Sequence, residues 1–143
     1  MSLNLVKFKV LDARATIPTR ATDGSIGYDL YLLEDIRLEP GEKKLISLGI
    51  SIQHPDNLGS FILPRSSSAK KGLLLANAVG VIDTDYIGEL KIVLHNTLSS
   101  VAYALKTEAT AQLVFIPKIT VQFVEDDFIP TKRGEKGFGS TDN

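Results

Sequence analysis

Apolar and polar residues alternate with a period of two along most of this chain, as in β-strands with one buried face. The alternation is clearest in three stretches. Their apolar positions are Val6, Phe8 and Val10; Ile46, Leu48, Ile50 and Ile52; and Leu90, Ile92 and Leu94. No stretch has the apolar spacing of a long amphipathic helix. The period therefore predicts an all-β fold.

Three further runs, residues 59–63, 112–116 and 119–124, have strand composition, and Gly, Pro, Asn and Asp separate the runs. Many short strands at this spacing indicate a β-sandwich or a jelly-roll-like, distorted β-barrel. At most one short helix is expected, over residues 66–71. A chain of 143 residues without an internal repeat or linker predicts one domain, residues 1–131, followed by a flexible C-terminal arm, residues 132–143.

The composition is that of an ordinary globular domain, with 43% hydrophobic and 23% charged residues. The net charge of −1 provides no basic field that would attract nucleic acid. The chain has no cysteine, which excludes disulfides, thiolate metal sites and thiol catalysis. No signal-peptide pattern or membrane-length apolar run is found. We therefore expect a soluble intracellular protein, in the cytoplasm, nucleus or a host cell, without a membrane or nucleic-acid partner.

The C-terminal arm combines basic, glycine, aromatic and hydroxyl residues in the sequence KRGEKGFGSTDN. Such a segment cannot bury enough apolar surface to fold alone. Its contents nevertheless suit a nucleotide. Arg133 can bind phosphate with its forked guanidinium, backbone amides at Gly137 and Gly139 can approach phosphate oxygens, and Phe138 can stack on a base. The arm is therefore predicted to be a lid over a nucleotide site.

Three other segments concentrate polar groups among the predicted strands. Residues 24–30 carry Asp29 after two glycines, and residues 63–72 carry Arg65 and a run of serines. Residues 77–88 are predicted to form a hairpin with an asparagine, two acidic residues and a tyrosine close together. Taken singly, each segment also fits a turn or a helix cap. His54 and His95 have no partner at a metal-ligand spacing, so no function is assigned to them.

Together with the strand AQLVF (residues 111–115) and the arm, these segments resemble the five ordered motifs of the trimeric dUTP pyrophosphatases, the dUTPases. The five matching stretches are GYDL, PRSS, NAVGVIDTDYIG, AQLVF and RGEKGFGST. The resemblance runs from Gly24 to Thr141. It implies an all-β dUTPase fold and hydrolysis of dUTP to dUMP and pyrophosphate. This reaction limits uracil incorporation into DNA and supplies dUMP for thymidylate synthesis.

The resemblance also implies roles for individual residues. Asp83 would orient and activate the water that attacks the α-phosphorus, as a general base does. Asp29 would organise Mg²⁺ indirectly, through its waters, with the metal held mainly by the substrate phosphates. The residues implied to bind phosphate are Arg65, Ser66, Ser67, Gln112, Arg133, Ser140 and Thr141.

Specificity is implied to reside in the hairpin and the arm. Asn77 and the hairpin backbone, including Gly80, would read uracil and exclude a thymine methyl group. Tyr86 would lie under the deoxyribose and exclude a 2′-hydroxyl, while Phe138 and the neighbouring Gly139 would cover the base. Members of the family are homotrimers in which three subunits contribute to each site, so the resemblance implies a homotrimer.

Several positions depart from the family pattern. Lys136 and Asp142 stand where the fifth motif usually has glycine, and Ser68 stands where the second motif usually has leucine. The stretch 107–110, which includes Ala109, replaces a Gly-Asp-Arg-Ile turn, and the missing arginine affects subunit packing. None of these departures removes a residue assigned to the chemistry.

Three other functions are compatible with parts of the pattern. A dCTP deaminase would share the fold, but this chain has Val93 approximately where a deaminase needs a glutamate to carry a proton. A dUTPase-like regulatory protein would bind a protein partner. A structural or lectin-like jelly roll would leave the arm unexplained.

Overall fold

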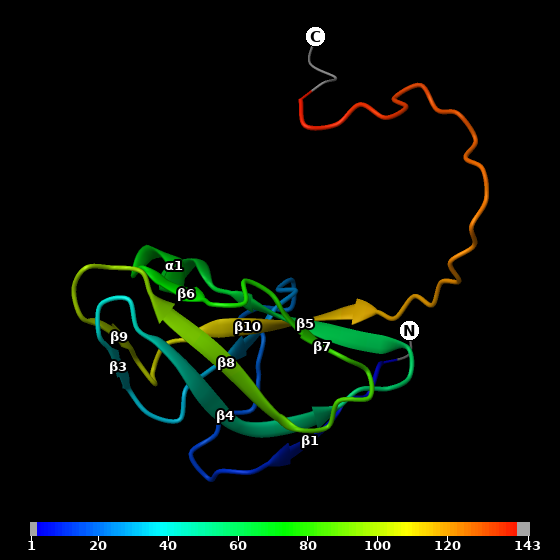
Figure 1. Cartoon of the computed structure of the whole chain (residues 1–143). Helices are drawn as coiled ribbons and strands as arrows, with labels where there is room; N and C mark the ends of the chain where they lie inside the picture. The colour runs from blue at the N-terminus through cyan, green and yellow to red at the C-terminus, as the bar shows by residue number, and fades with distance from the viewer. Residues whose placement is uncertain (1–2, 140–143) are drawn as a thin grey trace.

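The computed structural model describes residues 3–139, which form three antiparallel sheets and one short helix (Figure 1). The elements are β1 (Lys7–Val10), β2 (Tyr28–Leu30), β3 (Ile36–Leu38), β4 (Lys43–Gln53), β5 (Leu58–Pro64), α1 (Ser66–Lys70), β6 (Leu73–Leu75), β7 (Gly80–Ile82), β8 (Glu89–Asn96), β9 (Ala102–Ala104) and β10 (Ala111–Pro117). One sheet has the order β1-β4-β8-β6, the second β2-β10-β5-β7, and β3 pairs with β9. The predicted all-β fold with one short helix is confirmed.

The two four-stranded sheets contribute to one hydrophobic core. In β8 the predicted alternation holds, because Leu90, Ile92 and Leu94 are buried while Lys91 between them is exposed. Ile62 of β5 and Leu113 of β10 belong to the same cluster. Removal of this apolar surface from water is the main favourable contribution to folding.

β4 departs from strict alternation near its middle. Residues 48–52 are all buried, and the pairing with β8 shifts register between Ser47 and Ser51. Gly49 has φ +75°, and a Cβ there would lie 2.9 Å from the Cβ of Asp12. Glycine adopts this conformation without a steric penalty. This irregularity lets β4 pair with both β1 and β8. The loop after β1 packs closely on the backbone of β4 at Gly49.

Two predicted apolar strand faces remain uncovered in this chain. β1 forms and pairs with β4, but Phe8 and Val10 stay about half exposed. The strand predicted over residues 119–124 is wrong, because this stretch is extended, exposed and unpaired. Among residues 3–139, no strand pairs with this stretch.

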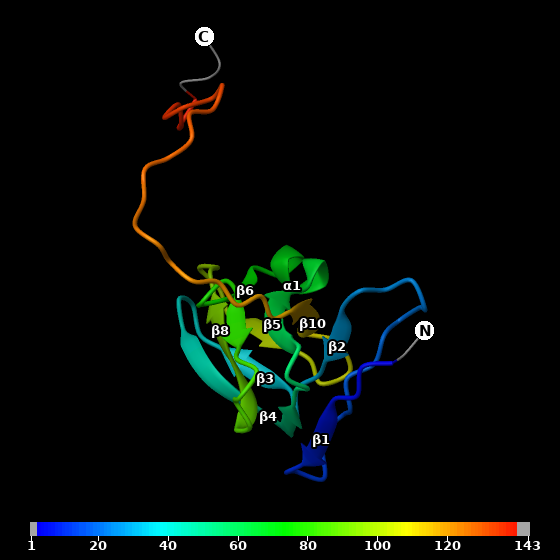
Figure 2. The ribbon, with the colours of Figure 1, turned by 90° about the vertical axis from the view of Figure 1, so that its right-hand side faces the viewer.

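Beyond β10 the chain leaves the packed body. The backbone N–H of Lys118 donates to the carbonyl oxygen of Asn57 (2.9 Å), and the following residues extend away from both sheets in two perpendicular views (Figures 1 and 2). The division of the chain at residue 131 into a domain and an arm stays a prediction. In residues 3–139 no helix is long and apolar enough to cross a membrane.

Candidate active site

A cluster of anion-binding groups lies where β5 ends. Pro64 closes the strand, and Arg65 has extended backbone angles (φ −101°, ψ 146°) immediately before α1. Ser66 and Ser67 then lie exposed on the first turn of this five-residue helix. The change from an extended strand to a helical turn therefore presents three consecutive donor side chains at one end of the sheet.

Asp29, Gln112 and Arg65 come from three neighbouring strands and meet at this end. Gln112 of β10 is opposite Asp29 of β2 on one side and opposite Leu63 of β5 on the other. Residues opposite one another, and residues two apart, share a sheet face, so Arg65 lies on the same face as Asp29. The guanidinium Nη1 of Arg65 donates to Oδ1 of the buried Asp29 carboxylate.

Gln112 is fixed beside this ion pair. Its side-chain Nε2 donates to the carbonyl oxygen of Pro64 (3.0 Å). The side chain also lies directly over Gly27, where any Cβ would overlap its amide group. Gly27, the first residue of the GYDL motif, is therefore a supporting residue, although the sequence analysis gave it no role of its own.

Ser68, one of the departures from the family pattern, has a structural explanation. Its side chain is buried, and Oγ donates to the carbonyl oxygen of Thr110 (2.9 Å). Lys71 also pairs with Glu108 across the same junction. The serine thus connects α1 to the loop before β10, in the stretch that itself departs from the family pattern.

The predicted uracil-reading hairpin is built around β7, which pairs with β5. Gly80 lies opposite Ile62, and a Cβ at Gly80 would lie 3.4 Å from Nδ2 of Asn77. Ala78 between them has φ +58°, and Ala78 N donates to the carbonyl oxygen of Leu75 (3.0 Å). The tight turn thus brings the Asn77 amide beside the backbone at Gly80.

Asp83 and Tyr86 lie at the opposite end of β7. They border a cavity of about 150 Å³ together with Val81, Ile82, Glu89 and Lys91. Thr84 anchors this turn to β5 by donating from Oγ1 to the carbonyl oxygen of Leu58 (2.6 Å).

Tyr86 donates from Oη to the carbonyl oxygen of Glu89 (2.8 Å), and its ring crosses Gly88. Thr84, Gly88 and the Glu89 carbonyl were not identified from the sequence.

The two clusters are separated within one chain. Ser60 pairs with Ile82, so Asp83 lies beside Gly59, at the start of β5, whereas Arg65 follows its end. At about 3.3 Å per residue, the six steps from Gly59 to Arg65 span roughly 20 Å. The Asp83 carboxylate and the Arg65 guanidinium of one chain are therefore too far apart to contact the same phosphate group.

The described part of the arm, residues 132–139, lies away from both sheets (Figures 1 and 2). Arg133 donates from Nε to the carbonyl oxygen of Lys136 (2.8 Å), and the Phe138 side chain is completely exposed. Phe138 has φ +49° and Gly139 has φ +83°, so the backbone turns sharply here. The predicted phosphate ligands Ser140 and Thr141, and the departure Asp142, lie outside the described residues.

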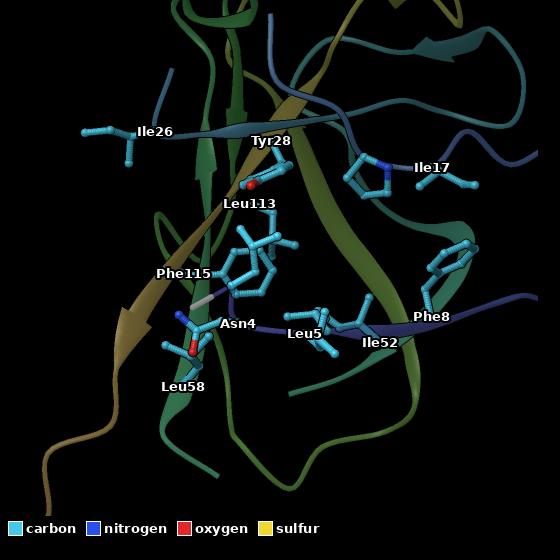
Figure 3. A pocket seen from close by; sticks show the side chains of 13 residues that line it. Asn4, Leu5, Phe8, Ile17, Ile26, Tyr28, Ile52, Leu58, Leu113 and Phe115 are labelled. Carbon is cyan, nitrogen blue, oxygen red and sulfur yellow. The ribbon is translucent and has the colours of Figure 1, made fainter. Parts of the chain in front are cut away.

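An apolar cavity of about 620 Å³ lies elsewhere, between the N-terminal segment, β2 and β10 (Figure 3). Leu5, Tyr28, Leu113 and Phe115 are among the side chains that surround it, and Tyr28 packs edge-to-face on Phe115. Its lining contains no charged side chain. It is therefore unsuited to a triphosphate, and the candidate site remains at the two ends of β5.

The fold and the two clusters have the chemistry of an all-β nucleotide-binding protein, and comparisons with known proteins identify the family. The family model described as dUTPase matches residues 13–142. A deoxyuridine 5'-triphosphate nucleotidohydrolase of Haemophilus influenzae is 43% identical, over 94% of this chain and 95% of its own length. The enzyme of the same name from Leptothrix cholodnii is 44% identical, over 95% of each chain.

A solved structure gives the same result at lower identity. A mutant dUTPase of Staphylococcus bacteriophage 80alpha with dUpNHpp superposes with a TM-score of 0.86 and is 27% identical, over 97% of this chain and 99% of that chain. This chain belongs to the dUTPase family. At the position where a deaminase would need its acid, Val93 lies within β8 as a half-buried apolar residue.

Proposed function

We propose that this protein hydrolyses dUTP to dUMP and pyrophosphate, with water attacking the α-phosphorus. Its family membership and its relatives named deoxyuridine 5'-triphosphate nucleotidohydrolase support this activity. The observation that carries the proposal is that one chain has both a cluster of phosphate donors at Arg65 and a small cavity bordered by the Asp83 carboxylate and the Tyr86 ring. Triphosphate hydrolysis needs both parts.

A homotrimer resolves the separation of these two parts. Since roughly 20 Å separates them along β5, the Asp83 turn of one copy must approach the Arg65 cluster of another. The arm, which extends away from its own body, then supplies Arg133 and Phe138 to a site on a neighbouring copy. Closed cyclic assembly would give every copy the same three roles.

In the assembled site, Arg65, Ser66, Ser67 and Gln112 donate to phosphate oxygens and neutralise the charge that develops on the leaving pyrophosphate. The Asp83 carboxylate, on a turn held by Thr84, accepts the proton of the attacking water. Arg133 closes over the terminal phosphates, with Ser140 and Thr141. Phe138 then covers the base and excludes bulk water.

The residues present fit a metal that arrives with the substrate. Among residues 3–139, no three His, Cys, Asp or Glu side chains are grouped so that they could hold an ion. Asp29 is the carboxylate nearest the phosphate donors, and it suits contact with an ion through water. Mg²⁺ bound by the substrate phosphates would neutralise charge and fix their geometry.

Base and sugar selection come from the hairpin. The Asn77 amide beside the Gly80 backbone offers donors and an acceptor to the uracil edge. The Tyr86 ring is fixed across the turn by its hydrogen bond to the Glu89 carbonyl oxygen, and in this proposal it lies under the deoxyribose and excludes a 2′-hydroxyl. A site whose polar groups are satisfied only by the right substrate discriminates by about 10⁴-fold or more.

Release of pyrophosphate from dUTP, dCTP, dTTP and UTP with Mg²⁺, with ammonia followed in parallel, tests the activity. Rapid release from dUTP alone, without ammonia, is the expected result. Ammonia from dCTP would identify a deaminase relative. No turnover of any nucleotide by folded protein would leave a binding or regulatory role.

Asp83→Asn tests the proposed base. The amide keeps the shape of the side chain but cannot accept a proton, so kcat should fall by about 10²–10⁴-fold while binding of dUpNHpp stays within a few-fold of wild type. Steady-state kinetics and calorimetric titration measure the two effects. Asp85→Asn, two residues along the same turn, is the matched control. Wild-type turnover by Asp83→Asn would remove Asp83 from the mechanism.

A further inference from the structure

The Asp29 carboxylate is buried, and burial of a charge is unfavourable unless an opposite charge or hydrogen bonds compensate for it. Only 9% of its side chain is exposed. In the described part of the chain, its side-chain partner is Arg65. Its own backbone N–H donates to the carbonyl oxygen of Thr19 (2.8 Å), which fixes the position of the residue in β2. Asp29 is therefore a rigid anchor.

Arg65 is the longer and more exposed member of this pair. It follows the last residue of β5, and about a third of its side chain is exposed. A long side chain at the end of a strand has many rotamers, and a carboxylate that accepts from the guanidinium removes most of them. The anchor therefore determines where the positive charge of Arg65 lies.

The contact with Asp29 uses only one of the N–H donors of the Arg65 guanidinium. Of its five N–H groups, one donates to Asp29, and Nε is buried without a hydrogen-bond partner among the described residues. Gln112, Ser66 and Ser67 surround the same end of the strand with further donors. The Nη donors that Asp29 does not use therefore lie in the cluster that the proposed function assigns to phosphate.

We propose that Asp29 is a positioning residue, which orients Arg65 for the triphosphate whether or not a metal is present. This inference rests on the proposed function and adds a second role to the indirect metal contact implied for Asp29. The two roles differ in one measurable respect. A positioning role persists when no divalent ion is available, whereas a role through metal waters vanishes.

Calorimetric binding of dUpNHpp in EDTA and in Mg²⁺ separates these roles. With EDTA present, Asp29→Asn should weaken binding by about tenfold, the lower end of what loss of an orienting partner costs. In an Arg65→Gln background the same substitution should have little further effect, because the group that it orients is gone. Asp12→Asn is the matched control, since it disrupts a carboxylate–guanidinium pair with Arg14 outside the cluster.

Unchanged or tighter binding by Asp29→Asn in EDTA would overturn the inference, as would additive losses in the double variant. Failure of the wild-type protein to bind dUpNHpp would instead contradict the proposed function. If Asp29→Asn unfolds, the Nη1–H resonance of Arg65, the donor to Asp29, provides a second test in the wild-type protein. We expect it to be protected from solvent exchange in EDTA, and rapid exchange would contradict the inference.

Discussion

His54 is a buried histidine at the end of β4 that the proposed mechanism does not use. Its Nε2 lies 2.7 Å from Oγ of Ser60, its ring packs edge-on against Phe115, and Nδ1 has no hydrogen-bond partner among the described residues. Neither neighbour carries a charge. Burial therefore lowers the pKa of His54 below its ordinary value of 6.5.

This burial predicts a pH dependence of stability. The unfolded chain takes up a proton at His54 near pH 6.5, whereas the folded protein does so only at lower pH. The contribution of His54 to the free energy of unfolding should therefore decrease as the pH falls from about 6.5 toward the folded-state pKa. Above about pH 6.5 this contribution should stay constant. Urea unfolding at a series of pH values between about 5 and 8 measures how the free energy of unfolding changes with pH.

His54→Gln should lose this contribution, because glutamine keeps a polar group near Ser60 but does not titrate. His95→Gln is the matched control, since it leaves the buried ring in place. An identical slope for wild type and His54→Gln would mean that other groups cause the acid sensitivity.

At the scale of elements, the hairpin after β7 fixes the Tyr86 ring through a glycine. A Cβ at Gly88 would lie 2.7 Å from Cζ of Tyr86 and 2.5 Å from Oη. Gly88→Ala should therefore displace the ring and break its hydrogen bond to the Glu89 carbonyl oxygen. We expect the ratio of kcat/KM for dUTP over UTP to fall by about tenfold, with Tyr86→Ala giving a larger loss.

Gly24→Ala is the control for this prediction, because the position is open and its nearest neighbour, Oγ1 of Thr22, would lie 4.0 Å away. Steady-state kinetics with both nucleotides provide the measurement. Sugar selectivity that survives in Gly88→Ala but not in Tyr86→Ala would show that the ring needs no support from the glycine.

The period of two predicted β1, β4 and β8, and strand composition predicted β5 and β10, while α1 forms over the serine run. The three-residue strands β3, β6 and β9 also pair within the chain but were not predicted. The same rule failed at residues 119–124, since alternation indicates an apolar face but not whether the chain itself covers it. The pairing of Asp29 with Arg65 was also beyond the sequence, because it depends on the order β2-β10-β5 across the sheet.

At the scale of the whole molecule, residues 119–139 contribute almost nothing to the core of their own chain. Ile119, Val121 and Phe123 are each more than half exposed. Removal of residues 132–143 should therefore leave the thermal unfolding midpoint nearly unchanged. Hydrolysis of dUTP should fall by at least about 10²-fold, because the proposed function assigns closure over the phosphates to Arg133 and the residues after it. Calorimetry and pyrophosphate release measure the two effects, and full activity after truncation would contradict the proposed lid.

A mixture of two inactive variants tests where the arm acts. In a cyclic trimer whose arm and Asp83 turn come from different copies, each assembly mixed from Asp83→Asn and arm-truncated chains contains about one complete site in three. Refolding the two variants together should therefore restore hydrolysis, while each variant refolded alone stays inactive. If the arm and the Asp83 turn of a site came from the same copy, every mixed assembly would lack one or the other. If the mixed trimers stay inactive, the arm and the Asp83 turn of each site come from the same chain.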